Sequence, residues 1–135
     1  MRHLLRASLV VLSLVVIACG GGMNTPVDAG SSPVGNVMGG LTVYINNSCG
    51  GCHGTDGAGT TSGPTITGNM MAGIGGWTQV EFNKALRERI GKDGVMFCAS
   101  MQAYPRLTDQ QLADLLAFLK SKDSATVQRG PPSCQ

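Results

Sequence analysis

The sequence Cys-Gly-Gly-Cys-His occupies residues 49–53. Two cysteines three positions apart lie on one turn of a helix, so both thiols can form thioethers with the two vinyl groups at the edge of one porphyrin. The histidine that follows points its imidazole at the iron, and the two glycines between the cysteines carry no side chain that would crowd the ring. The stretch therefore predicts a covalently attached haem c, held by Cys49, Cys52 and His53.

Two other uses of these cysteines stay open at this point. Cys49 and Cys52 could form a redox dithiol, although the chain lacks the alternation of strands and helices that is typical of a thioredoxin-like fold. They could also join Cys98 and Cys134 in a structural zinc site. Four-cysteine zinc sites usually bring their ligands as two close pairs, and the last two cysteines stand far apart in the sequence.

The composition limits the size of the protein and its partners. The chain has 135 residues, of which 13% are charged and 4% are aromatic, and its formal net charge is +2. This length allows one small domain. So small a net charge provides no broad basic surface for nucleic acid. The five cysteines are an odd number, so at least one of them is not paired with another cysteine of the chain.

Residues 1–18 are typical of an export signal, because the basic residues Arg2 and Arg6 precede an uncharged run rich in Leu and Val. This run is too short to span a membrane comfortably. The run ends in Val-Ile-Ala-Cys, which resembles the bacterial lipoprotein signal. The resemblance implies that Cys19 is lipidated and becomes the new N-terminus, anchored in the cell envelope and facing the periplasm. The alternative is an ordinary secretory signal cut elsewhere, which leaves Cys19 a free thiol. Both interpretations export the chain.

Cleavage before Cys19 leaves His53 as the only histidine. A single histidine excludes a two-histidine metal site, a bis-histidine haem and a second imidazole for acid–base catalysis. Residues 19–40 are rich in glycine and show no hydrophobic periodicity, which predicts a flexible tether.

Around the haem motif, residues 37–121 resemble a class I, single-haem cytochrome c. The resemblance rests on the run CHGTDG at residues 52–57 and the loop GPTITG at residues 63–68. It implies an all-α cytochrome c fold, in which three main helices and glycine-rich loops surround one haem. In this family the proline carbonyl of the loop receives the second ring nitrogen of the ligand histidine, so Pro64 is expected to orient His53.

The hydrophobic pattern places three main helices in a domain at residues 41–122, followed by a C-terminal tail at 123–135. The first helix covers residues 41–45, with Leu41, Tyr44 and Ile45 on one face. It leads directly into the haem motif.

Two capping boxes predict where the other helices begin. The first box starts at Thr78 and opens a helix that continues to about Ile90, with Gly91 as its stop. The second box starts at Thr108 and opens the last helix. The apolar stripe of that helix consists of Leu112, Leu115, Leu116 and Leu119.

The ligand opposite His53 decides what the haem does, since a filled position favours electron transfer and an open one admits gases or peroxide. In the family this ligand is a methionine shortly before the last helix, and residues 101–109 match that register. The resemblance therefore implies Met101, with Met96 as the competitor. Gln102 stands where the family usually has proline, a change that is expected to loosen the loop and weaken the iron–sulfur bond.

A thioether ligand favours ferrous iron, and a filled sixth position excludes oxygen and peroxide. The expected function is thus one-electron transfer between redox proteins such as an oxidase, a dehydrogenase or a reductase, without catalysis by the chain itself. The alternative is a haem enzyme or gas-binding sensor with an open or labile sixth position.

Trp77, Cys98 and Cys134 are also expected to have roles near the haem or in holding the C-terminal tail. The resemblance places Trp77 where the family often has a residue near a haem propionate, and an ordinary packing role explains this tryptophan equally well. Cys98 and Cys134 are expected to pair in an exported protein. Their disulfide would fasten the C-terminal tail near the methionine loop, and the alternative is two unpaired cysteines.

Overall fold

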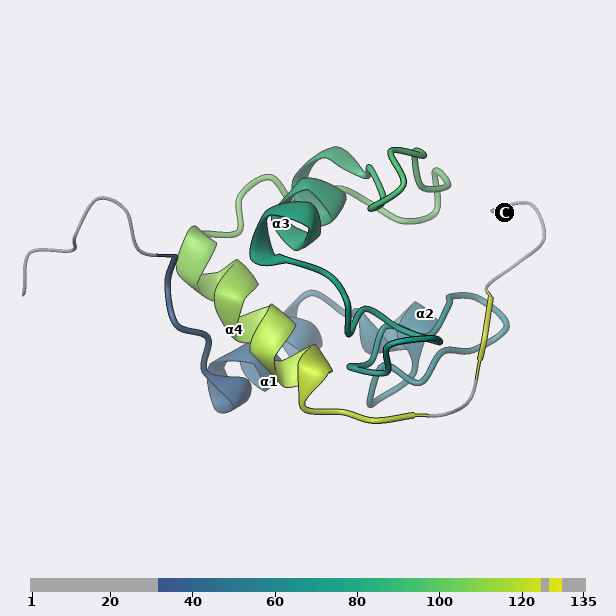
Figure 1. The fold of residues 1–135 in the computed structure, drawn as a ribbon, viewed down its shortest axis with the longest axis horizontal. Helices are drawn as coiled ribbons and strands as arrows, with labels where there is room; N and C mark the ends of the chain where they lie inside the picture. The colour runs from purple at the N-terminus through teal and green to yellow at the C-terminus, as the bar shows by residue number, and fades with distance from the viewer. Residues whose placement is uncertain (1–31, 125–126, 130–135) are drawn as a thin grey trace, which may run out of the picture.

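The computed structural model describes residues 32–124 and 127–129 of the chain. This part holds four helices, α1 (Val37–Asn46), α2 (Gly50–His53), α3 (Gln79–Glu88) and α4 (Asp109–Lys120), and no strand (Figure 1). The predicted all-α fold with three main helices is confirmed, and α2 is the short helix of the haem motif. The signal at residues 1–18, Cys19 and Cys134 lie outside the described residues.

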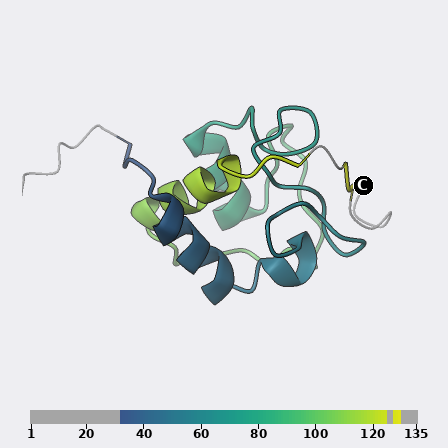
Figure 2. The same cartoon turned by 90° about the horizontal axis from the view of Figure 1, so that it is seen from below.

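The first and last helices form the main helix–helix contact. Helix α1 crosses α4 at close range, whereas α3 packs on α4 through a smaller area (Figure 2). A Cβ atom built on Gly40 would lie 2.0 Å from the carbonyl oxygen of Asp114 in α4, so the crossing has room only for glycine. The carboxylate of Asp114 also accepts a hydrogen bond from the main-chain N–H of Asn36 at 2.7 Å.

Helix α1 begins at Val37, earlier than the predicted start at residue 41. The side chain of Asn36 accepts a hydrogen bond from the main-chain N–H of Gly39 and caps the helix. Residues 37–40, placed in the tether because of their glycines, therefore belong to the helix. The predicted apolar face is confirmed at Tyr44, which is buried, and was wrong at Ile45, which is 64% exposed while Val43 is buried.

Helix α3 begins as predicted and ends earlier. The capping box of Thr78 and Glu81 is complete, with hydrogen bonds in both directions. The helix stops at Glu88 because Arg89 adopts a left-handed conformation with a φ of 63°. The chain then turns back, and the main-chain N–H of Phe97 donates to the carbonyl of Arg89 at 2.7 Å. The prediction that the helix continues to Ile90 was wrong.

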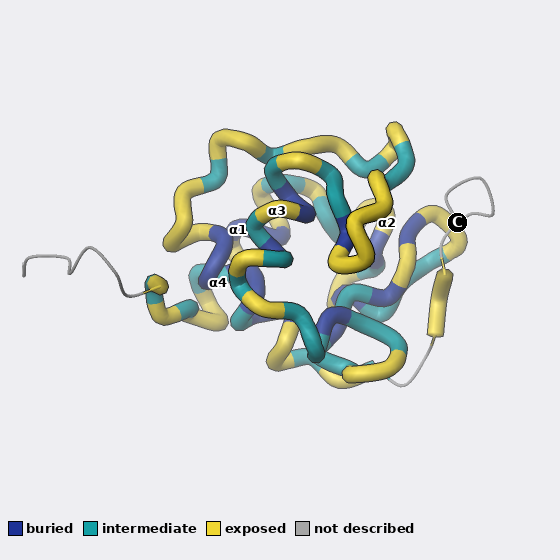
Figure 3. The backbone as a smooth tube through the Cα atoms, turned by 45° about the horizontal axis from the view of Figure 1, so that its top comes forward, coloured by how far each residue is buried: buried dark blue, intermediate teal, exposed yellow. Residues whose placement is uncertain are grey.

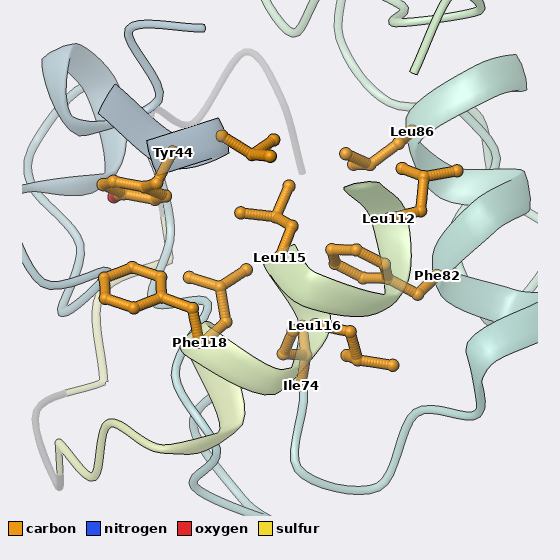
Figure 4. Close-up of a cluster of buried hydrophobic side chains, with 10 residues drawn as sticks. Tyr44, Ile74, Phe82, Leu86, Leu112, Leu115, Leu116 and Phe118 are labelled. Carbon is orange, nitrogen blue, oxygen red and sulfur yellow. The ribbon is translucent and has the colours of Figure 1, made fainter. Parts of the chain in front are cut away.

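The core lies between α4 and the other two long helices (Figure 4). The predicted leucine stripe of α4 is buried along its whole length. Phe118 is buried as well, and its ring centroid lies 5.3 Å from that of Tyr44. The outer faces of the helices and much of the connection between α3 and α4 are exposed (Figure 3).

Candidate functional site

A cavity of about 340 Å³ opens against α3, α4 and the segments that flank α2. Most of its lining is apolar, including Phe82 and Leu86 of α3 and Leu115 and Leu119 of α4. The predicted site residues that line it are Cys49, Cys52, His53, Pro64, Trp77, Cys98 and Met101. The structure thus brings every predicted site residue that it describes to one cavity.

The haem motif forms the single turn of α2. The main-chain N–H of His53 donates to the carbonyl of Cys49 at 3.0 Å, which closes this turn. The hydroxyl of Tyr44 donates to the carbonyl of Gly54 at 2.6 Å, and the hydroxyl of Thr60 donates to the carbonyl of Cys52 at 2.5 Å. These contacts fix the motif from both sides. The sequence predicted that Tyr44 lies on the apolar face of its helix together with Leu41, but it did not predict the hydrogen bond of its hydroxyl to the haem motif.

The imidazole of His53 is buried and held in one tautomer. Its Nδ1 lies 2.8 Å from the carbonyl oxygen of Pro64. A carbonyl only accepts hydrogen bonds, so Nδ1 carries the proton and Nε2 keeps a lone pair that can bind a metal ion. Burial lowers the pKa of His53 despite this hydrogen bond, and the ring is therefore neutral at pH 7. The structure contains the contact that the loop resemblance implies for Pro64.

The two cysteines of the motif differ in their surroundings. Cys49 is half-buried and Cys52 is exposed, and both are free thiols. Burial raises the pKa of the Cys49 thiol. Both sulfurs line the cavity, one helical turn apart, as attachment to one porphyrin requires.

The described residues contain three of the four cysteines of the zinc interpretation, since Cys134 lies outside them. No group of three or more His, Cys, Asp or Glu side chains in residues 32–124 and 127–129 could hold a metal ion. Cys98 is not among the free thiols of this part of the chain. Its predicted partner Cys134 lies outside the described residues, so the pairing of the two stays a prediction.

Met101 is the one methionine in the described part of the chain that lines the cavity. It is partly buried and packs against the hydrophobic core. Its main-chain N–H donates to the carbonyl of Cys98 at 3.0 Å, which forms a tight turn before α4. The competitor Met96 is 65% exposed and lies outside the cavity lining.

Trp77 lines the cavity just before α3 and also joins two helices. Its main-chain carbonyl accepts a hydrogen bond from the ammonium group of Lys120, at the end of α4, at 2.6 Å. Its side chain packs against the hydrophobic core, so a packing role is present, and an interaction of its indole with a propionate stays a prediction.

The lining fits a haem. A porphyrin is a large apolar ring, and the cavity offers it apolar walls, two thiols one turn apart and a neutral imidazole. Sequence reasoning also missed Ile66 and Ile74, which lie in loops without any periodic pattern that could have identified them.

No helix in the described part of the chain is long and apolar enough to cross a membrane. Over 59 residues the chain is 39% identical to the fructose dehydrogenase cytochrome subunit of Gluconobacter japonicus. This alignment covers 42% of the chain but 12% of that much longer relative. Residues 37–123 match the cytochrome c family, a range that takes in all four helices and the cavity walls from α1 to the end of α4. The chain therefore belongs to the cytochrome c family, and its cavity is the site of a covalently bound haem c that serves electron transfer.

Proposed function

We propose that the chain is a single-haem electron carrier in which His53 and Met101 are the axial ligands of the iron. The observation that carries the proposal is that both side chains line the cavity that also holds Cys49 and Cys52. The other methionines of the described residues, Met38, Met70, Met71 and Met96, are all more than half exposed.

The bound haem c supplies a redox centre that changes its charge by one electron. The residues of the chain set the conditions for that change. Pro64 keeps the proton on Nδ1 of His53, so that Nε2 faces the cavity as a ligand. The thioether of Met101 favours the ferrous state and fills the remaining position. The apolar side chains of α3 and α4 keep water away from this centre.

The partners we propose are redox proteins, with a dehydrogenase as the electron donor of first choice. The chain shares part of its sequence with a cytochrome subunit of fructose dehydrogenase, which supports this choice. An oxidase or a reductase would then accept the electron. The chain itself makes and breaks no covalent bond of a substrate.

We also propose export and lipid anchoring through Cys19, with the haem domain facing the periplasm. The basic, then apolar, residues 1–18 support this location. Replacement of Cys19 by serine should release the protein from the membrane fraction. If the variant stays with the membrane as firmly as the wild type, the lipid anchor is refuted.

A disulfide between Cys98 and Cys134 completes the proposal. Because the main-chain N–H of Met101 binds the carbonyl of Cys98, a disulfide at this position would hold the turn that carries Met101. Cys134→Ser should weaken the methionine–iron absorption band in the ferric protein. An unchanged band would count against a role of the disulfide in methionine ligation.

Carbon monoxide binding tests the axial ligation. The full chain is expressed with haem-maturation machinery, and pyridine-haemochrome analysis establishes one haem per chain. We expect the ferrous wild type to be low-spin and to ignore carbon monoxide, whereas Met101→Ala binds it readily. The control Met96→Ala should behave as the wild type. Ready binding by the native protein would instead favour a haem enzyme or gas sensor with a labile sixth position.

A further inference from the structure

The C-terminal segment 127–129 packs on the loop that orients His53. The main-chain N–H of Thr65 donates to the carbonyl of Gln128 at 2.9 Å, and the main-chain N–H of Gln128 donates to the hydroxyl of Thr65 at 3.0 Å. Thr65 is buried and directly follows Pro64, whose carbonyl binds His53. The segment is therefore fixed beside the haem site by two hydrogen bonds.

This contact brings Arg129 to the cavity. Arg129 is the only lysine or arginine among the described residues that line the cavity, and no described aspartate or glutamate lines it. No hydrogen bond or ion pair joins its guanidinium to the described part of the chain. In contrast, Arg87 and Arg89 do not line the cavity, and their guanidinium groups donate to the carbonyls of Leu107 and Phe97. Arg129 is thus an uncommitted cation at the wall of the haem site.

A haem c carries two propionate carboxylates at the edge of an otherwise apolar ring. A carboxylate taken from water into an apolar cavity is unstable unless it gains a charged or hydrogen-bonding partner. The planar guanidinium of arginine matches the two oxygens of a carboxylate. We propose that Arg129 pairs with a propionate of the bound haem, so that the C-terminal segment forms part of the cofactor site.

The pairing has a consequence for the redox state of the iron. A positive charge close to the haem favours the ferrous iron over the ferric iron, which carries one more positive charge. Removal of the charge of Arg129 should therefore lower the reduction potential. The inference rests on haem c in this cavity and is independent of whether Met101 is the sixth ligand.

The test compares three variants of the full-length, haem-loaded protein. Arg129→Gln removes the charge, and Arg129→Lys keeps it without the planar fork. Arg106→Gln is the matched control, because Arg106 is exposed and lies outside the cavity lining. Haem stoichiometry and the visible spectrum are recorded first, so that failed haem attachment is separated from a change in potential.

At a fixed solution potential near the wild-type midpoint, Arg129→Gln should raise the ferric-to-ferrous ratio about two- to fivefold. This corresponds to a potential lower by roughly 20–40 mV, at 59 mV per tenfold change for one electron. Arg129→Lys should shift the ratio less than Arg129→Gln, and Arg106→Gln should leave it unchanged. Equal ratios for Arg129→Gln and Arg106→Gln would overturn the proposal.

A crystal structure of the haem-loaded wild type gives a second test that needs no variant. We expect a nitrogen of Arg129 within about 3.2 Å of a propionate oxygen. A guanidinium that points into solvent, with both propionates bound elsewhere, would refute the pairing even if the protein carries electrons as proposed. Carbon monoxide binding reports on the sixth ligand alone, so failure of the axial proposal is seen separately.

Discussion

The side-chain amide of Gln102 donates a hydrogen bond to the hydroxyl of Tyr104 at 3.0 Å. The same hydroxyl donates to the main-chain carbonyl of Asn47 at 3.4 Å. Asn47 lies between α1 and the first cysteine of the haem motif, so these contacts tie the loop of Met101 to the other side of the cavity. The sequence predicted that Gln102, in place of proline, loosens the loop that carries Met101. In the structure, the side chain of Gln102 instead forms a hydrogen bond that helps to hold this loop.

Tyr104→Phe should therefore weaken the hold on Met101 without changing the cavity wall. Burial raises the pKa of Tyr104, so its hydroxyl keeps its proton at neutral pH and is available as a donor. Loss of the two hydrogen bonds should favour methionine dissociation by about 0.5–1.5 kcal/mol. A urea titration of the methionine–iron absorption band in the ferric protein measures this change. Gln79→Ala, which removes the half-buried hydrogen bond between Gln79 and Asn83 away from the cavity lining, should leave the titration of the band unchanged.

Gly40→Ala tests the crossing of α1 and α4. The new Cβ would meet the carbonyl oxygen of Asp114 at 2.0 Å, and main chain cannot move aside as a side chain can. We expect a net loss of about 1–3 kcal/mol in the free energy of unfolding, since overpacking exceeds the better helix propensity of alanine. Gly39→Ala is the control, because its Cβ would meet only the carboxylate of the Asp114 side chain. Equal urea midpoints for the two variants would contradict this account of the crossing.

Local signals explain why much of the fold could be predicted. The capping boxes at Thr78 and Thr108 are complete within four residues each, and both helices begin where their caps predict. The leucine stripe of α4 repeats with the helical period, and it forms the buried face. The haem motif is likewise contiguous in the sequence, so haem attachment could be predicted from these five residues alone.

Features that depend on distant partners could not be predicted in this way. In the sequence, the glycines at the start of α1 indicate a flexible chain. In the structure, they lie against α4, which leaves no room for a side chain at these positions. The early end of α3 depends on the left-handed conformation of Arg89 and on the hydrogen bond that the main-chain N–H of Phe97 donates to the carbonyl of Arg89. Arg129 belongs to a tail without any pattern, and a hydrogen bond between Gln128 and Thr65 brings that tail to the cavity.

Glu81 should make the stability of α3 depend on pH. Hydrogen bonds from the main-chain N–H and hydroxyl of Thr78 lower the pKa of the Glu81 carboxyl. A lowered pKa in the folded state means that the stabilisation is present above the unfolded pKa and is lost as the pH falls through the folded value. Melting temperatures of the wild type and Glu81→Gln should therefore differ at pH 7 and converge in acid. A difference that stays constant down to pH 3 would show that the charge of Glu81 contributes nothing.

Removal of the haem should unfold most of the domain. The cavity of about 340 Å³ is walled by core side chains such as Phe82 and Leu115, which lose their contact partner when no haem is attached. A small domain is stabilised by only about 5–15 kcal/mol in total, so it cannot leave so much apolar core surface open to water and stay folded. A Cys49→Ser/Cys52→Ser variant produced without haem should show little helical circular dichroism and no cooperative urea transition, whereas the haem-loaded wild type shows both. A compact variant with a cooperative transition would contradict a core that depends on the haem.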